Sequence, residues 1–234
     1  STTRVQNKLK ERITLIVCAN ATGNHKIPCT MIGKPGQPSC IRGRNWPIPY
    51  FSLKKAWMDT DICWKWFNEV FFPSIKRRTG RPVLLILDNA PGHFDEFERD
   101  GVRVVCLPPN CTSWKQPCDM GIIAALKERY KYSYLNDVLS FYDLAEDLQS
   151  LKKQAASRLR RGAAGVEYGF PATLLDAANY VKIRLEKITP DTIINSFKKA
   201  EIIILDDLKI ANTLTEYEEI SEIIAHSNSV NLLY

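Results

Sequence analysis

Hydrophobic positions near the start of the chain form two short runs on either side of a polar turn. The runs are residues 13–18 and 27–32, and the turn is Asn-Ala-Thr-Gly-Asn at 20–24. Short runs rich in β-formers and bounded by turn-forming residues predict a β-hairpin. Glycine and proline then recur through residues 33–49, which we interpret as a loop.

A helical pattern follows at residues 54–72. Its apolar residues recur at helical spacing and give a broad apolar face rich in aromatic side chains, Trp57 among them. Aromatic residues on such a face are more often buried in a core than exposed as a platform for stacking. We therefore expect these aromatic side chains to lie in the core.

Two further runs predict parallel strands, of which 83–87 should lie at the exposed side of the sheet. Residues 83–87 (VLLIL) are uninterrupted and apolar, which is typical of a strand buried on both faces. A second strand is predicted at 102–107, after a polar segment in which we expect a short helix. A helix should begin near Cys118 or Asp119 and continue through Tyr130. This order of elements predicts an α/β core with a mixed sheet.

The rest of the chain has a helical pattern. Residues 137–151 and 171–188 have helical spacing, glycines mark a loop between them, and Thr189-Pro190-Asp191 predicts another helix start. We therefore divide the chain into a core at 1–135, a helical extension at 136–200 and an acidic tail at 201–234.

Composition narrows the class of protein. The 234 residues are 45% hydrophobic and 25% charged, as in ordinary globular domains. No apolar run approaches the roughly 20 residues that span a bilayer, so we expect no membrane partner. The seven cysteines include no Cys-x-x-Cys pair, which argues against a zinc site or a disulfide framework. We interpret them as reduced core residues of an intracellular protein.

Charge is unevenly distributed along the chain. The net charge is +6, of which residues 201–234 contribute −6 and residues 1–200 contribute +12. A basic body indicates a polyanionic partner, or simply a basic solvated surface. Basic residues cluster at 4–12, 76–81 and 152–161. In the last cluster, Arg158, Arg160 and Arg161 are candidates for contacts with DNA phosphates, and the alternative is a solvated helix face.

Two aspartates are the main candidates for chemistry. Asp88 follows the strand predicted at 83–87, where ligands of open α/β sheets bind, and Asp119 begins a helix after the next strand. Carboxylates that meet at one sheet edge can hold Mg²⁺, and a pair of such ions can cleave phosphodiesters. The alternatives are an Asx turn at Asp88 and a helix N-cap at Asp119.

Three neighbouring side chains are weaker candidates. His93 could contact a substrate phosphate or a metal-bound water, or it could cap the short helix expected after it. Asn89 is first a turn residue and second an outer residue that orients a ligand. Gln116 could shape the approach to Asp119.

Longer stretches around these residues resemble one known family. LLILDNAPGH (84–93), VVCLPPNCTSWKQPCDMGII (104–123) and RITLIVCANATGNHKIPCTMIGK (12–34) are similar to the pogo/Tigger-like DDE transposases. These are mariner-related DDE superfamily endonucleases, a group that includes centromere protein B and jerky-like proteins. The resemblance covers roughly residues 10–135, with a weaker similarity at 188–203.

The resemblance implies a fold and a catalytic site. The fold is an RNase H-like mixed sheet flanked by helices, here with an all-helical C-terminal extension. The site is a triad of acids that holds two Mg²⁺ or Mn²⁺ ions, with Asp88 as the second acid and Asp119 as the third. The first acid lies on a strand that this sequence does not contain, between 12–18 and 83–87 in the sheet. We therefore expect unpaired strand edges, which favour self-association, and no activity from this chain alone.

Two functions from different classes remain open. The resemblance implies a transposase-derived endonuclease that cuts and joins DNA in the nucleus and has no small-molecule substrate. The alternative is a non-catalytic transposase remnant that serves as a nucleic-acid-binding or interaction module. Retention of Asp88 and Asp119 favours an enzymatic ancestry.

Overall fold

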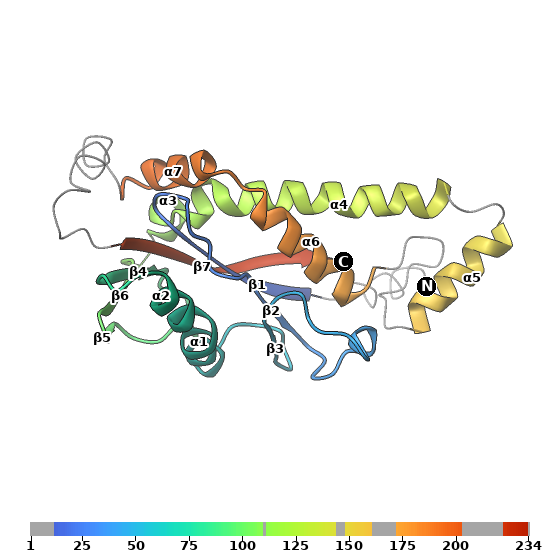
Figure 1. Cartoon of the computed structure of the whole chain (residues 1–234), viewed down its shortest axis with the longest axis horizontal. Helices are drawn as coiled ribbons and strands as arrows, with labels where there is room; N and C mark the ends of the chain where they lie inside the picture. The colour runs from blue at the N-terminus through green and yellow to red at the C-terminus, as the bar shows by residue number, and fades with distance from the viewer. Residues whose placement is uncertain (1–11, 110, 144–147, 161–171, 203–221, 234) are drawn as a thin grey trace.

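A mixed sheet with helices on both faces forms the centre of the protein (Figure 1). The computed structural model describes residues 12–109, 111–143, 148–160, 172–202 and 222–233. In these residues the strand order is β3-β2-β1-β7-β4-β6-β5. The strands are β1 (Arg12–Asn20), β2 (Thr30–Gly33), β3 (Tyr50–Ser52), β4 (Val83–Leu87), β5 (Phe97–Arg99), β6 (Val102–Cys106) and β7 (Glu222–Leu233).

The predicted hairpin is confirmed. β1 and β2 are antiparallel, with Thr14 opposite Ile32. The turn between them is closed by the Gly23 N–H, which donates to Asn20 O at 3.0 Å. Gly23 has a φ of +70°, and a β-carbon there would lie 2.5 Å from Pro190 Cα. Only glycine therefore allows the turn to lie against the start of the helix at Pro190.

The two strands predicted at 83–87 and 102–107 are also confirmed, but the expected place of 83–87 at the exposed side of the sheet is wrong, because β4 lies between β7 and β6. β4 and β6 are parallel, with Leu87 opposite Cys106. The short helix expected between them is wrong, because the described residues 88–101 contain the edge strand β5 and no helix. Phe97 in β5 packs against Phe94 and Trp64, with ring centroids 5.1 and 4.9 Å away. These aromatic contacts hold the segment against the sheet.

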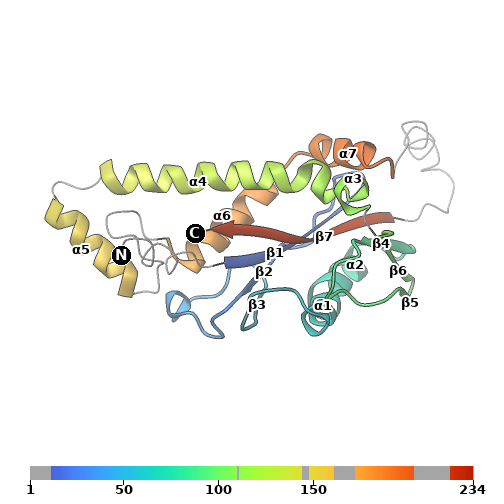
Figure 2. The ribbon, with the colours of Figure 1, turned by 180° about the vertical axis from the view of Figure 1, so that it is seen from behind.

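The gap expected between β1 and β4 is filled. β7 lies between them, antiparallel to β1 and parallel to β4 (Figure 2). Ile224 of β7 is opposite both Asn20 and Leu85. The expected unpaired edges are therefore wrong for these strands, because β7 satisfies their backbone N–H and C=O groups. Unpaired edges were the reason for expecting self-association, so these strands give no support to that expectation.

β7 also corrects the expected C-terminal region. We expected an all-helical extension and then an acidic tail, but residues 222–233 form a strand in the middle of the sheet. Residues 203–221 and 234 of that expected tail lie outside the described residues. The polar residues in 222–233 hide this strand from pattern analysis, because central strands are usually apolar. The division of the chain at 135 and 200 stays a prediction.

One face of the sheet is covered by α1 (Thr60–Trp66), the π-helical turn η3 (Phe67–Phe71) and α2 (Phe72–Arg78). The helix begins six residues later than predicted, since the Asp59 side chain caps it by accepting from Ile62 N at 2.9 Å. Trp57 precedes the helix and is 57% exposed, so its expected burial is wrong. Trp66 is fully buried, as predicted.

The other face is covered by η4 (Cys118–Ile122), α4 (Ile123–Asp143), α6 (Leu174–Glu186) and α7 (Pro190–Lys199) (Figures 1 and 2). Alternate residues of β1 point to the two faces. Leu15 and Val17 pack in the cluster with α4, α6 and α7, while Ile16 packs with α1 and α2. This alternation places β1 in the interior of the protein. The short helices η2 (Ser39–Ile41) and α3 (Thr112–Lys115) lie in connections.

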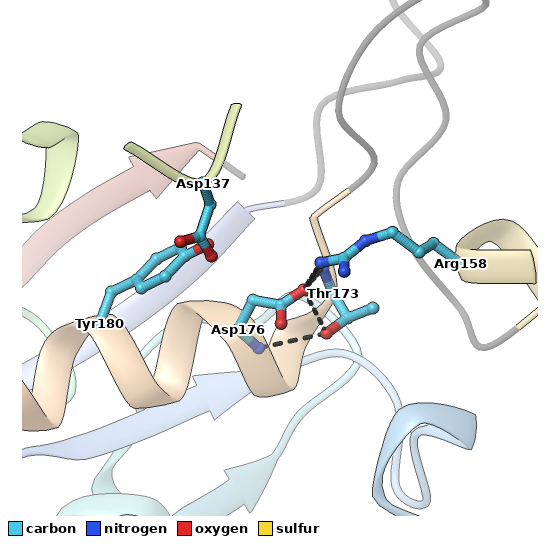
Figure 3. Close-up of polar contacts among 5 residues, drawn as sticks. All are labelled: Asp137, Arg158, Thr173, Asp176 and Tyr180. Atoms are coloured by element: carbon cyan, nitrogen blue, oxygen red, sulfur yellow. Dashed lines mark hydrogen bonds and ion pairs between the residues drawn. The ribbon is translucent and has the colours of Figure 1, made fainter. Parts of the chain in front are cut away.

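The helix predicted at 137–151 is divided. α4 ends at Asp143 and α5 (Leu148–Arg160) follows, while residues 144–147 and the glycine loop expected near 162–169 lie outside the described residues. α5 contacts α6 through Arg158, whose Nη2 lies 2.7 Å from Asp176 Oδ2 (Figure 3). Asp176 also forms a capping box with Thr173 at the start of α6. Nearby, Tyr180 donates a hydrogen bond to Asp137.

The cysteines match the expectation in part, because Cys40, Cys106 and Cys111 are only partly buried. All seven lie in the described part of the chain, and none forms a disulfide. Cys18, Cys29, Cys63 and Cys118 are buried. None of the described helices is both long enough and apolar enough to cross a bilayer.

Candidate functional site

Asp88 lies where β4 ends and the chain turns away from the sheet. The residue is 7% exposed. Its Oδ1 accepts a hydrogen bond from Ala90 N at 3.3 Å, so the Asx turn that we considered is present. The turn fixes the direction of the carboxylate at the carboxyl end of the central strand.

His93 holds the same carboxylate from the other side. Its Nδ1 lies 2.8 Å from Asp88 O and 3.0 Å from Asp88 Oδ1. Both partners are oxygen acceptors at these distances, which requires the tautomer with hydrogen on Nδ1. The imidazole is 3% exposed. His93 therefore orients Asp88, and its alternative role as a helix cap is wrong because no helix follows it in residues 94–101.

Gly92 explains why this turn can pack closely on the helical layer. It has a φ of +105°, which disfavours a side chain. A β-carbon would also lie 2.8 Å from Met58 O. The Asp88 turn thus rests directly on the backbone that leads into α1.

Asp119 lies in the first turn of η4. The N-cap of this element is Pro117, so the interpretation of Asp119 as a plain N-cap is wrong. Its backbone N–H donates to Gln116 O at 3.0 Å. The adjacent Cys118 donates through its thiol to Val17 O at 3.6 Å, which ties η4 to β1. Asp119 itself remains solvent-exposed.

The two aspartates are electrostatically coupled, although they are 31 positions apart. Partial desolvation raises the pKa of Asp119, the negative charge of Asp88 raises this pKa further, and the cation of Lys127 lowers it. Asp88 is thus close enough for its charge to act on the Asp119 carboxyl group. Pattern analysis missed Lys127, whose only signal was its place eight residues after Asp119 on the same helical segment.

The weaker candidates lie in different surroundings. Asn89 is exposed beside Asp88, while Gln116 is fully buried beneath η4 and its backbone oxygen also accepts from Met120 N at 3.2 Å. Arg158 lies on α5 in the ion pair with Asp176. The side chain of Arg160 and the whole of Arg161 lie outside the described residues.

The residues present fit a hard divalent cation only in part. Two carboxylates provide the oxygen ligands that Mg²⁺ prefers, and Mg²⁺ commonly keeps several waters beside one or two carboxylates. Among the described side chains, no group of three His, Cys, Asp or Glu residues could hold a metal ion. A cavity of about 300 Å³ lined by Lys26, Cys29 and Lys182, among others, includes neither aspartate.

The chain is similar to several known proteins. The chain is 39% identical to the Jerky protein of Mus musculus over 123 residues, which is 48% of this chain and 22% of that protein. It is 26% identical to Tigger transposable element-derived protein 4 of Mus musculus over 82% of this chain and 33% of that protein. It is 30% identical to ARS-binding protein 1 of Schizosaccharomyces pombe over 60% of this chain and 28% of that protein.

The family match described below covers strands of the sheet and helices on both of its faces. The chain spans between a fifth and a third of these curated relatives, and no solved structure matches it. The family described as DDE superfamily endonuclease matches residues 10–197, which run from β1 through most of α7. The chain belongs to the DDE superfamily endonuclease family.

Proposed function

We propose that this chain is part of the catalytic core of a transposase-derived endonuclease that acts on DNA in the nucleus. Asp88 and Asp119 are two carboxylates of its site for Mg²⁺ or Mn²⁺. The observation that carries the proposal is the coupling of these two carboxylates at the carboxyl end of β4, in a chain of this family. Ligand sites of open α/β sheets gather at such strand ends.

The described side chains support specific roles in this site. His93 and the Ala90 N–H hold the Asp88 carboxylate in one orientation. Asp119 is exposed and can approach a bound ion, and Lys127 offsets part of the negative charge. A bound divalent ion would polarise the phosphate and activate the attacking hydroxyl. Asn89 and Gln116 serve as outer residues that shape the approach.

The strand arrangement supports an RNase H-like sheet. In the sheet that the resemblance implies, a strand with the first acid lies between the strands at 12–18 and 83–87. β7 takes this place, antiparallel to β1 and parallel to β4. The chain alone is expected to be inactive, since the described residues contain no third acid grouped with the pair. Cutting and joining of DNA belong to the intact protein.

The alternative is a non-catalytic module that holds DNA or protein. The observation that favours it is the occupation of the same place by β7, a strand whose one acid, Glu222, is opposite Val83 at the end of β4 that is away from Asp88. A relative named ARS-binding protein 1 supports a DNA partner under either proposal.

Binding of Mn²⁺ in the presence and absence of duplex DNA tests the proposal. We expect weak Mn²⁺ binding that tightens when DNA is added, because phosphate oxygens complete the coordination. Asp88→Asn and Asp119→Asn should each abolish it, while Asp143→Asn, an exposed acid at the end of α4, should not. DNA binding that is unaffected by Mn²⁺ and by both site substitutions would favour the non-catalytic module instead.

A further inference from the structure

Charged residues are separated between the two ends of the central strands. Near the carboxyl ends lie Asp88 and the acidic pair Asp95 and Glu96. Burial raises the pKa of Cys106, the last residue of β6, and the charges of these three acids raise it further. The amino ends of β4 and β6 carry mostly cations. We call this second group the basic rim, and it consists of Lys76, Arg77, Arg78, Arg81 and Arg99.

Separate segments bring the basic rim together. Lys76 Nζ at the end of α2 donates to Asp100 O in the β5–β6 turn at 3.0 Å. Arg78 Nη2 donates to Asn24 Oδ1 in the β1–β2 turn, also at 3.0 Å. Arg81 precedes β4 by two residues. α2, the β1–β2 turn and the β5–β6 turn therefore meet at the end of the sheet where β4 and β6 begin.

Aromatic packing holds two of these cations in place. Lys76 Nζ lies 5.2 Å and Arg99 Cζ lies 5.5 Å from the ring centroid of Phe72. Both side chains are thus positioned by a cation–π contact and not left to move freely. An anchored cation loses less side-chain freedom when it contacts a phosphate.

The rim keeps most of its positive charge. Its one ion pair among the described residues joins Arg99 to Asp100 at 3.3 Å, and both side chains are about half exposed. Such an exposed pair is weak and is readily exchanged for another anion. Arg77 and Arg81 are both exposed. The five cations at this end of the sheet therefore form a surface suited to a phosphate backbone.

The rim is too far from the aspartates to serve them directly. β4 separates Arg81 from Asp88, and its five residues span about 16 Å at the usual rise of a strand. A duplex whose phosphates contact the rim therefore does not place those phosphates at Asp88.

We propose that the basic rim binds the phosphate backbone of duplex DNA at a place separate from the Asp88–Asp119 pair. The rim would hold a second DNA segment while another reaches the aspartates, and only this pairing of two segments rests on the proposed function. Recognition at the rim is by charge, so little sequence preference is expected.

The test measures binding of a fluorescent 20-base-pair duplex by anisotropy at several salt concentrations in EDTA, so that no metal site contributes. The double variant Arg77→Gln/Arg81→Gln should bind more weakly and flatten the log–log salt dependence by about two, one unit for each phosphate that it can no longer neutralise. The matched control, Lys131→Gln/Lys182→Gln, removes two exposed cations from α4 and α6. It should change the slope much less. Thermal melts confirm that all variants are folded.

Two further measurements separate this inference from the proposed function. The double variant Asp88→Asn/Asp119→Asn should retain the salt-dependent binding of DNA at the rim. If the unaltered chain does not bind Mn²⁺, that result contradicts the proposed metal site and leaves the rim proposal unaffected. The rim proposal is overturned if the rim variant and the control weaken binding equally. It is also overturned if the aspartate variant loses the EDTA-resistant binding, or if duplex RNA competes at a concentration more than tenfold below that of duplex DNA.

Discussion

Gly121 lies so close to Ser196 that a β-carbon on the glycine would be 2.7 Å from the serine Oγ. Ser196 is 2% exposed, and its hydroxyl donates to Thr192 O at 2.8 Å. The hydroxyl is therefore not free to move away. The contact fixes the turn that carries Asp119 against α7, a helix that begins about seventy positions later in the chain.

Gly121→Ala should destabilise the protein and weaken any metal site at Asp119. The added methyl group overpacks a buried contact, which typically costs about 1–3 kcal/mol. Backbone strain is not the reason, because the φ of Gly121 is 170°, which any residue adopts. Chemical denaturation measures the free energy of unfolding, and Mn²⁺ titration measures the site.

Ser196→Ala provides the control for this contact. It removes the clashing oxygen and leaves the serine β-carbon at 3.8 Å, an ordinary contact. Alone it should cost about 1 kcal/mol for the missing hydrogen bond. The double variant should be more stable than the two single effects predict. Strict additivity would show that Gly121 is needed for another reason.

Metal affinity should depend on pH through Asp119. Because its pKa is raised, Asp119 keeps its proton to a higher pH than an ordinary aspartate, and a metal ion must displace that proton. Mn²⁺ affinity should therefore rise as the pH increases through this pKa. Asp88→Asn should lower the pKa of Asp119 by removing a negative neighbour, as carboxyl ¹³C NMR titration can show. An unchanged titration would mean that the two carboxylates do not interact.

The same raised pKa has a defined sign for stability. Asp119 binds its proton more tightly in the folded chain than in the unfolded chain. Its contribution to the free energy of unfolding is therefore fully present below the unfolded pKa. The contribution is lost as the pH rises through the folded pKa. Asp119→Asn should remove this part of the pH dependence, and Asp143→Asn should leave it in place.

His93 should act as a positioning residue for Asp88. His93→Leu removes the Nδ1 donor, and loss of such an outer partner typically lowers metal affinity by about 10–100-fold. His93→Asn should retain most of the affinity, because an amide N–H can reach the same two oxygens. Mn²⁺ titration of both folded variants makes the comparison. Equal losses in the two would indicate that His93 supports the fold only.

β7 should be necessary for a cooperative fold. Ile224→Pro removes a backbone N–H at the position opposite Asn20 and Leu85 and leaves buried partners unsatisfied. We expect a lower and broader thermal transition, with aggregation through the exposed strand edges. Ile224→Val keeps the strand and should change little. A sharp melt at an unchanged temperature for the proline variant would show that β7 does not occupy this place.

The cluster at 152–161 offers a second test of DNA binding. Replacing Arg158, Arg160 and Arg161 together should weaken binding evenly across sequences and flatten the salt dependence by about 0.9 for each phosphate that is no longer neutralised. Replacing Arg158 alone should also reduce stability by less than about 1 kcal/mol, because its pair with Asp176 is partly exposed. Asp176→Asn breaks the same pair and keeps the arginine, so weaker DNA binding in that variant would point to an effect of stability.

Local patterns determined much of the core. The uninterrupted run at 83–87 indicated a buried strand, the run at 102–107 indicated a second strand, and the Asn-Ala-Thr-Gly turn indicated a hairpin. Asp88 could be placed because a strand end and a turn signal occur within a few residues. The motifs around Asp88 and Asp119 also identified the family.

Contacts between distant segments were decided only by the tertiary structure. β7 has no clear strand pattern, and it takes its place because β1 and β4 have backbone groups that only a strand between them can pair. The approach of Lys127 to Asp119, of Ser196 to Gly121 and of Arg78 to Asn24 depends on how helices cross the sheet. Periodicity records which side of an element is buried, and it carries no information on which partner covers that side.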